Sequence, residues 1–284
     1  MSKDLTFIFN LEPYTKMYEH HDIVERDSQR MCLMMCSSIK ASHPDSKIIG
    51  MSANGNMPDS KTLEELSKIG VEFDNTVVEA NPFNGFFNKI HAYHHLSRKV
   101  TTPYVCLLDI DVLLLKEINF EKIKILLEKY DALSALGHEG RLTQIKVNPM
   151  YLRAFKSKEH EFYMEEKHGV TAFNLFPSGI MFFKSSNLPS FMDEWLDKSK
   201  EIVKDEKLLD FYSKEVFQPL TLTDEEPLSQ VINNKNVLMI RGAEFKHYHI
   251  FTLLNRAIKE GLELSENIIE ILKKYDFPFS EELV

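Results

Sequence analysis

The sequence predicts an α/β fold with a mixed, mostly parallel sheet flanked by helices. Strand-like and helix-like segments alternate over residues 1–115, the signature of a parallel sheet with helices on both faces. The run Tyr104–Leu115 (YVCLLDIDVLLL) has the continuous hydrophobicity of a strand buried on both faces. No internal repeat or linker divides the chain. We expect a single domain over 1–284, built from segments 5–115, 116–250 and 251–284.

Short apolar runs mark the expected strands, and capping or turn residues mark the helix ends. The polar stretch Glu12–His21 is expected to form a loop on the edge where open α/β sheets bind ligands. The expected strands are Leu5–Asn10, Lys47–Met51, Val71–Phe73 with an extension to Val77 and Val78, Tyr104–Leu115, Asp131–Leu136, Gly179–Lys184, Val237–Ile240 and Phe245–Ile250. The expected helices are one capped by Asp27 or Ser28 and ended by Pro44, then Ser60–Gly70, Asn84–Arg98, Phe120–Lys129, Leu188–Val203, Asp224–Asn233 and Thr252–Lys274.

The composition indicates a globular protein with a sizeable core. Of 284 residues, 43% are hydrophobic and 27% are charged. The formal net charge of -9 argues against a nucleic-acid binder, which usually carries a basic patch. The cysteine count of 3, with Cys106 in the expected central strand, does not fit a disulfide framework. No signal peptide or membrane span is visible, so we expect a cytoplasmic protein; the sequence does not indicate an oligomeric state.

Two aspartates interrupt the central apolar run. A strand that continues through Asp109 and Asp111 puts both carboxylates on one side, because side chains alternate with a period of two. Two carboxylates in a dry environment raise each other's pKa, and a divalent cation removes that conflict. The alternative is that the strand ends at Leu108 and both aspartates lie in a turn. The return of the apolar run at Val112 favours the continuous strand.

Two later segments add candidate ligands and acids. His247 and His249 interrupt an apolar segment, and carboxylate with imidazole suits Mn²⁺, whereas Mg²⁺ prefers oxygen and water. Either histidine could instead be a hydrogen-bonded core residue. Asp224, Glu225 and Glu226 precede a short expected helix, where they are either active-site acids or charges stabilised by the helix dipole.

These segments, in this order, resemble the GT-A fold nucleotide-sugar glycosyltransferases. The resemblance rests on YVCLLDID, then GIMFFK, then DEEPLS and finally HYH, and it covers residues 5 to 250. It is specific to the superfamily and not to one family. It implies a GT-A (Rossmann-like) fold and transfer of a hexose or pentose from a nucleotide-sugar donor, most often a UDP-sugar, to a hydroxyl of a glycan acceptor, with Mn²⁺ or Mg²⁺. Glycogenin-like features favour retention at the anomeric carbon.

The resemblance also implies roles for residues around the Asp-x-Asp motif. Asp109 and Asp111 would bind the metal and, with Ile110 between them, the donor. A late histidine would complete the metal shell. We prefer His249 to His247 because it lies nearer the end of its apolar segment, but the sequence does not decide between them.

Further roles follow for the acidic segment and the region before the late strand. Glu225 would correspond to the catalytic glutamate of the blood-group-type galactosyltransferases, with Asp224 and Glu226 beside it. In members with an Asp-Gln-Asp segment, Glu225 and Glu226 stand where the Gln and the second Asp would be. The family's Asn-Ala-Gly before the later strand is Pro177-Ser178-Gly179 here, so its asparagine has no counterpart.

The remaining candidates lie in the expected nucleotide-binding half, 5–115, and acceptor-binding half, 116–250. Phe9 and Asn10, at the end of the first strand, match the usual position of base contacts, although an aromatic residue there is also ordinary core. Lys89 precedes the aspartates on a helix, where a solvated helix face is the simpler interpretation and a donor contact the alternative. The irregular insertion Gly140–Gly169 is the expected acceptor side, with four aromatic residues: Tyr151, Phe155, Phe162 and Tyr163.

Three other classes compete with this interpretation. Haloacid-dehalogenase-type phosphatases carry Asp-x-Asp on their first strand and need a later acid pair, whereas here over 100 residues precede the motif and no such pair follows. Sugar nucleotidyltransferases carry a glycine-rich loop after the first strand, and LTFIFNLEPY has no glycine. A protein that binds a nucleotide sugar without turnover is compatible with the sequence.

Overall fold

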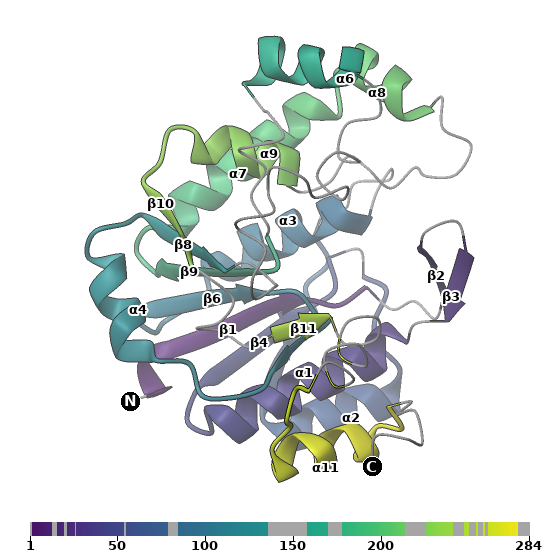
Figure 1. The fold of residues 1–284 in the computed structure, drawn as a ribbon, viewed down its shortest axis with the longest axis vertical. Coiled ribbons are helices and arrows are strands. Elements are labelled where there is room, and N and C mark those ends of the chain that lie inside the picture. The colour runs from purple at the N-terminus through teal and green to yellow at the C-terminus, as the bar shows by residue number, and fades with distance from the viewer. Residues whose placement is uncertain are drawn as a thin grey trace.

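The centre of the molecule is a seven-stranded sheet in the order β10-β8-β9-β6-β1-β4-β5 (Figure 1). This computed structural model describes residues 2–12, 16–19, 22–25, 27–53, 55–78, 85–135, 158–169, 178–213, 225–240, 247–249, 254, 258 and 261–277. The strands of the sheet are β1 (Leu5–Asn10), β4 (Lys47–Met51), β5 (Val71–Asp74), β6 (Tyr104–Leu108), β8 (Ala132–Ala135), β9 (Ile180–Lys184) and β10 (Val237–Ile240). β9 runs antiparallel to β6 and β8, and the other neighbouring pairs are parallel. The predicted single-domain α/β fold with a mixed, mostly parallel sheet is confirmed.

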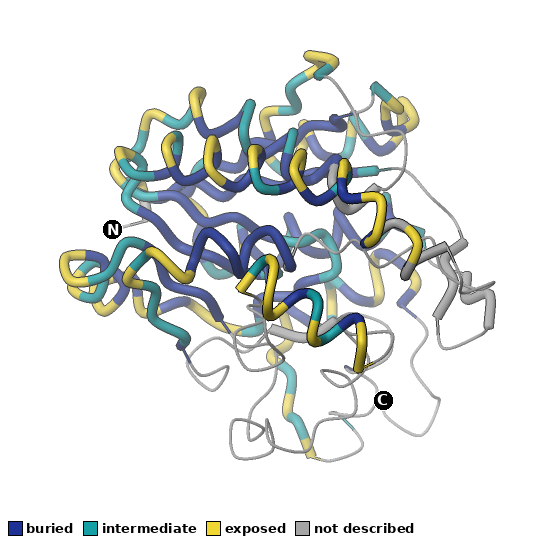
Figure 2. Tube along the Cα trace, turned by 90° about the horizontal axis from the view of Figure 1, so that it is seen from above, coloured by how far each residue is buried: buried dark blue, intermediate teal, exposed yellow. Residues whose placement is uncertain are grey.

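Helices cover both faces of this sheet. On one face lie α1 (Ser28–Ser42), α2 (Ser60–Ile69), α4 (Phe120–Leu127) and α11 (Glu266–Lys274), all of which contribute to one hydrophobic cluster. On the other face lie α3 (Gly85–Ser97), α7 (Leu188–Ile202) and α9 (Glu225–Ile232), with α7 packed between α3 and α9. The central strands are buried and the outer sides of the helices carry the exposed residues (Figure 2).

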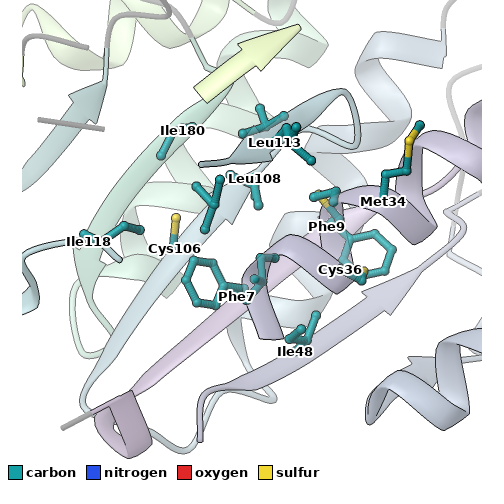
Figure 3. Packing of buried hydrophobic residues seen from close by; sticks show 14 of the residues in the cluster. Phe7, Phe9, Met34, Cys36, Ile48, Cys106, Leu108, Leu113, Ile118 and Ile180 are labelled. Atoms are coloured by element: carbon teal, nitrogen blue, oxygen red, sulfur yellow. The ribbon is translucent and has the colours of Figure 1, made fainter. Parts of the chain in front are cut away.

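The central strands divide their side chains between the two faces with the expected period of two. In β1, Phe7 and Phe9 enter the cluster under α1, while Ile8 enters the cluster under α3. In β6, Cys106 and Leu108 lie on the α1 side (Figure 3), and their neighbours on the α3 side. Burial on both faces explains why these strands consist mostly of apolar residues.

Local capping fixes the ends of the first helices. The side chain of Asp27 accepts hydrogen bonds from the amides of Gln29 and Arg30, so α1 begins where the sequence predicts. Gly70 ends α2 with φ of 87°, a conformation that a side chain would strain. These caps are local in sequence, which is why they were predictable.

Several elements differ from the prediction. Part of the expected loop Glu12–His21 is the strand β2 (Lys16–Glu19), which pairs antiparallel with β3 (Asp22–Glu25). The expected helix from Thr252 to Lys274 is not continuous: Leu254 and Ile258 are helical, Gly261 has a φ of 96°, and α11 begins at Glu266. Val77 and Val78 do not extend β5, and α8 (Glu206–Ser213) was not predicted.

The expected irregular insertion is described only in its second part, which is helical. It contains α6 (Lys158–Tyr163) and a π-helical turn, Met164–His168, labelled η3 here. Residues 140–157 of the insertion lie outside the described part of the chain. In the described part, no helix combines the length and the apolar character needed to cross a membrane.

Candidate functional site

The Asp-x-Asp motif lies in a turn at the carboxyl end of β6. The strand ends at Leu108, so the continuous strand was the wrong prediction and the turn alternative is correct. The amide of Asp109 still donates to the carbonyl of Gly179 at 2.9 Å, but the amide of Val112 donates back to the carbonyl of Asp109 at 3.3 Å and closes the turn. The chain then leaves the main sheet as β7 (Val112–Leu114). The strand stops here because the backbone hydrogen bonds between β6 and the segment before β9 end at Asp109.

Lys89 reaches this turn from α3. Its ammonium lies 2.9 Å from Oδ1 of Asp109 and 2.9 Å from Oγ of Ser178. Only 9% of Lys89 is exposed, so the interpretation of a solvated helix face was wrong. One turn further along α3, the hydroxyl of Tyr93 donates to the carbonyl of Leu108 at 3.0 Å. The contacts of Lys89 with Asp109 and of Tyr93 with Leu108 fix α3 against the end of β6.

The pairing of β7 brings a distant segment next to the turn. β11 (His247–His249) runs antiparallel to β7, with His249 opposite Val112 and His247 opposite Leu114. The backbone of His249 is therefore one register position from Asp111, and that of His247 is three positions away. The side chains of both histidines lie outside the described part, so which of them is a metal ligand stays a prediction.

The described side chains at the turn fit a divalent cation as oxygen donors. The side chain of Asp109 is 25% exposed, and Asp111 and Ile110 are partly buried beside it. A Cβ placed on Gly179 would stand 3.5 Å from Oδ2 of Asp109, so the glycine leaves space beside that oxygen. Two carboxylates that are both partly exposed are the kind of oxygen donors that Mn²⁺ or Mg²⁺ prefers. Among the described residues, no three histidine, cysteine, aspartate or glutamate side chains form a cluster that could hold a metal ion.

The predicted catalytic acids stand at the start of α9, which begins at Glu225. Glu226 is 1% exposed, and residues 226–232 are all buried, so α9 is not a solvated helix. Asp224 and the side chain of Glu225 lie outside the described part. α9 leads into β10, which runs parallel to β8. The N-terminus of α9 is therefore directed toward the carboxyl edge of the sheet, where the aspartates lie.

The two candidates at the end of β1 have different surroundings. Phe9 is fully buried and packs against Phe73, with ring centroids 6.4 Å apart. Its ring also covers Gly50, so the core alternative describes Phe9 and the predicted base contact is not supported. Asn10 lies at the carboxyl edge, where Oδ1 accepts from the amide of Ala53 at 3.1 Å and ties β1 to the segment after β4.

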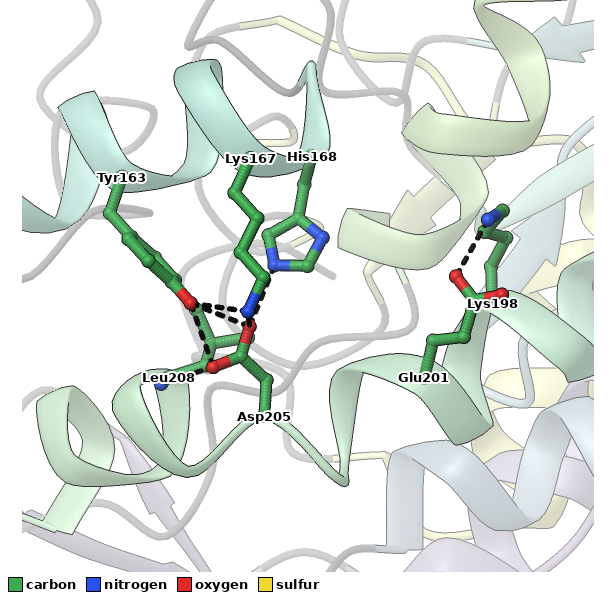
Figure 4. Close-up of polar contacts among 7 residues, drawn as sticks. All are labelled: Tyr163, Lys167, His168, Lys198, Glu201, Asp205 and Leu208. Carbon is green, nitrogen blue, oxygen red and sulfur yellow. Dashed lines mark hydrogen bonds and ion pairs between the residues drawn. The ribbon is translucent and has the colours of Figure 1, made fainter.

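A separate polar cluster joins α6 and η3 to α8 (Figure 4). The carboxylate of Asp205 accepts from the hydroxyl of Tyr163 at 2.8 Å, from Lys167 at 2.7 Å and from His168 at 3.0 Å. It also caps α8 by accepting from the amide of Leu208 at 3.2 Å. Burial alone would raise the pKa of Asp205, but these hydrogen bonds outweigh burial and hold the pKa well below its usual range.

This cluster places two of the predicted acceptor-side residues. Tyr163 is partly buried, and its hydroxyl donates to Asp205, so this hydroxyl serves the network. Phe162, one residue earlier, is 63% exposed and keeps its ring available to solvent. Tyr151 and Phe155 lie outside the described part. An acceptor role for this region stays a prediction.

The contact between Ser178 and Lys89 was not predicted from the sequence. The departure from Asn-Ala-Gly drew attention to Pro177-Ser178-Gly179 without giving the serine a role. Ser178 is 3% exposed and accepts from Lys89, which is 89 residues earlier in the chain. Only the antiparallel pairing of β9 with β6 brings Ser178 to the Asp109 turn.

No protein-family model matches the chain, and no curated protein matches it. Three similar solved structures are glycosyltransferases. The galactosyltransferase LgtC, in complex with donor and acceptor sugar analogues, is 14% identical with a TM-score of 0.46, over 84% of this chain and 73% of LgtC.

The other two similar structures are longer proteins. The bifunctional glycosyltransferase WbbM is 9% identical with a TM-score of 0.46, over 83% of this chain and 38% of WbbM. GlyE of Streptococcus pneumoniae TIGR4 is 14% identical with a TM-score of 0.41, over 84% of this chain and 45% of GlyE. This chain therefore spans less than half of WbbM and of GlyE. Because all three TM-scores are below 0.5, the functional proposal rests on the contacts within this chain.

Proposed function

We propose that the protein is a metal-dependent glycosyltransferase that moves a sugar from a nucleoside-diphosphate donor, most readily a UDP-sugar, to a hydroxyl of a glycan acceptor. The observation that carries the proposal is the pairing of β11 with β7, which brings the backbone of His249 beside the Asp109–Asp111 turn. The Asp-x-Asp motif and the backbone of His249, from segments 138 positions apart in the chain (249 − 111), then lie at the same edge of the sheet. Carboxylates with an imidazole are a donor set that suits Mn²⁺.

The residues at the turn are suited to hold a diphosphate. A divalent cation bound by Asp109 and Asp111 would supply Lewis-acid stabilisation of charge on the departing diphosphate. Lys89 adds a second positive charge 2.9 Å from Asp109. Its ammonium has three donors, and two of its neighbours are the carboxylate and Ser178. Positive charge from the metal and from Lys89 compensates locally for the acidic net charge of the chain.

The acidic segment is proposed to serve the reacting sugar. Glu225 begins α9, whose N-terminus is directed toward the carboxyl edge of the sheet, and Asp224 and Glu226 flank it. In a retaining transfer, such a carboxylate would stabilise positive charge that develops at the anomeric carbon. An inverting transfer would instead need a carboxylate to deprotonate the acceptor hydroxyl. We favour retention, which NMR of the first-formed product would test.

The test is a donor screen on the purified protein. UDP-, GDP- and CMP-sugars are added with Mn²⁺ or with EDTA, and both thermal stabilisation and donor hydrolysis are measured. The proposal expects stabilisation and turnover by one donor class with Mn²⁺ and neither in EDTA. Undiminished turnover in EDTA contradicts it. Stabilisation without hydrolysis or transfer indicates a non-catalytic binder, and phosphate release from a phosphomonoester without any nucleotide-sugar effect indicates a phosphatase.

A further inference from the structure

Three side chains from three separate segments meet at the Asp109 turn. Lys89 comes from α3, Asp109 follows β6, and Ser178 precedes β9. The register of β6 and β9 pairs Leu108 with Ile180, and the next bond joins the amide of Asp109 to the carbonyl of Gly179. The backbone around Ser178 is thus held beside the turn by the sheet itself. The Ser178 hydroxyl therefore projects from a backbone position that the sheet fixes.

The contact between Ser178 and Lys89 is well buried. Their exposed fractions are 3% and 9%, and the hydroxyl oxygen and the ammonium nitrogen are 2.9 Å apart. A lysine side chain has four flexible bonds and about 2 kcal/mol of rotamer entropy, so one carboxylate contact leaves it several conformations. A second acceptor on the opposite segment selects one of them. The ammonium then lies on Oδ1 of Asp109.

Gly179 sets the other side of the same carboxylate. A side chain there would begin 3.5 Å from Oδ2 of Asp109. The ammonium of Lys89 contacts Oδ1, and Gly179 adds no side chain beside Oδ2. Ser178 and Gly179 are adjacent, so one short segment controls both oxygens of Asp109: one through Lys89 and the other by leaving space.

We propose that Ser178 is a positioning residue of the donor site: its hydroxyl holds Lys89 on Oδ1 of Asp109 and so presets the ammonium that, together with a cation on the aspartates, would bind a nucleoside diphosphate. This inference rests on the proposed function. It adds a residue whose identity in this chain departs from the Asn-Ala-Gly pattern. The hydroxyl acts through Lys89 and does not itself need to touch the ligand.

The test compares three Ser178 variants, and then Lys89→Met and a double variant, by isothermal titration with UDP and with GDP, each in the presence of Mn²⁺. Ser178→Ala and Ser178→Cys remove the hydroxyl acceptor and should weaken nucleotide binding about tenfold, because hydrogen bonds to charged groups are the stronger ones. Ser178→Thr keeps the hydroxyl and should remain within about threefold of the natural protein. If packing alone matters, the order reverses, because threonine crowds a site that is 3% exposed. That reversal would overturn the proposal.

Lys89→Met supplies the coupling measurement. If Ser178 acts through Lys89, the double variant Lys89→Met with Ser178→Ala binds nucleotide no more weakly than Lys89→Met alone. Additive losses would overturn the inference and leave the proposed function standing. No binding of either nucleotide by the natural protein would overturn the proposed function, and the inference with it. Melting temperatures confirm that each variant is folded, and Ser178→Cys, of nearly natural volume, keeps the test decisive if alanine leaves a destabilising void.

Discussion

Two aspartates in this molecule, Asp109 and Asp205, show how differently one side chain can be used. Asp205 has a side chain that is 5% exposed, and it accepts from Tyr163, Lys167 and His168. Asp109 has a side chain that is 25% exposed and lies in a turn, with Lys89 on Oδ1 and the small residue Gly179 beside Oδ2. The first carboxylate is surrounded by protein donors. The second has an accessible side.

The difference indicates which carboxylate is structural and which is suited to a ligand. The donors around Asp205 come from residues 163, 167 and 168, and the π-helical turn brings them to one side of the helix. π-helical turns often mark functional sites. Here the turn serves a network that caps α8 and joins it to α6. Asp109 instead lies at the carboxyl edge of a mostly parallel sheet, where α/β folds bind ligands.

Asp111→Asn should produce the largest effect on activity. We expect a loss of transfer of about 10³-fold or more, because the variant removes one charge from the proposed cation site. The folded state should be retained, since Asp111 is partly exposed and lies in a turn. Steady-state rates with Mn²⁺, together with circular dichroism, check both parts. Full activity would show that Asp111 has no part in metal binding.

Asp205→Asn should affect stability and not nucleotide binding. Removing the charge leaves Lys167 without its anionic partner, and we expect a loss of about 2–3 kcal/mol in the free energy of unfolding. Urea denaturation measures it. Unchanged stability would mean that the network does not hold α6 to α8, and the contrast between the two aspartates would fail on the structural side.

The stability of the protein in acid should depend on the same Asp205 network. The pKa of Asp205 is lower in the folded protein than its ordinary value of 3.8, so its stabilising contribution is present above about pH 4. That contribution is lost as the pH falls below this value toward the folded-state pKa. The natural protein should therefore lose stability more steeply below about pH 4 than Asp205→Asn does. Parallel acid-denaturation curves would contradict this.

A second titrating group gives a smaller effect near neutral pH. Nε2 of His43 accepts from the amide of Ile118 at 3.0 Å, and burial lowers the pKa of His43 below its ordinary value of 6.5. The folded state favours the neutral form of His43, so the free energy of unfolding should fall as the pH drops below about 6.5. His43→Gln keeps an acceptor and should remove this pH dependence at a cost of about 1 kcal/mol. Melting temperatures between pH 5 and 8 measure it.

The sequence predicted those parts of the fold that depend on neighbours in the chain. The strand Leu5–Asn10 was correct to the residue, and Asp27 was one of the two predicted caps of α1, because alternation and capping are local. The environments of Lys89 and Ser178 were not predictable, because each is set by a partner far along the chain. The turn at Asp109 was mispredicted for the same reason. The apolar run resumes in β7, which serves a different sheet.

The most direct test compares the two aspartates in one measurement. Isothermal titration of UDP is performed on the natural protein, on Asp109→Asn and on Asp205→Asn, each with Mn²⁺ and with EDTA. We predict Mn²⁺-dependent binding that Asp109→Asn abolishes and Asp205→Asn preserves. Binding that is equally tight in EDTA, or that survives Asp109→Asn, would contradict the assignment of the Asp109–Asp111 turn as the metal and diphosphate site.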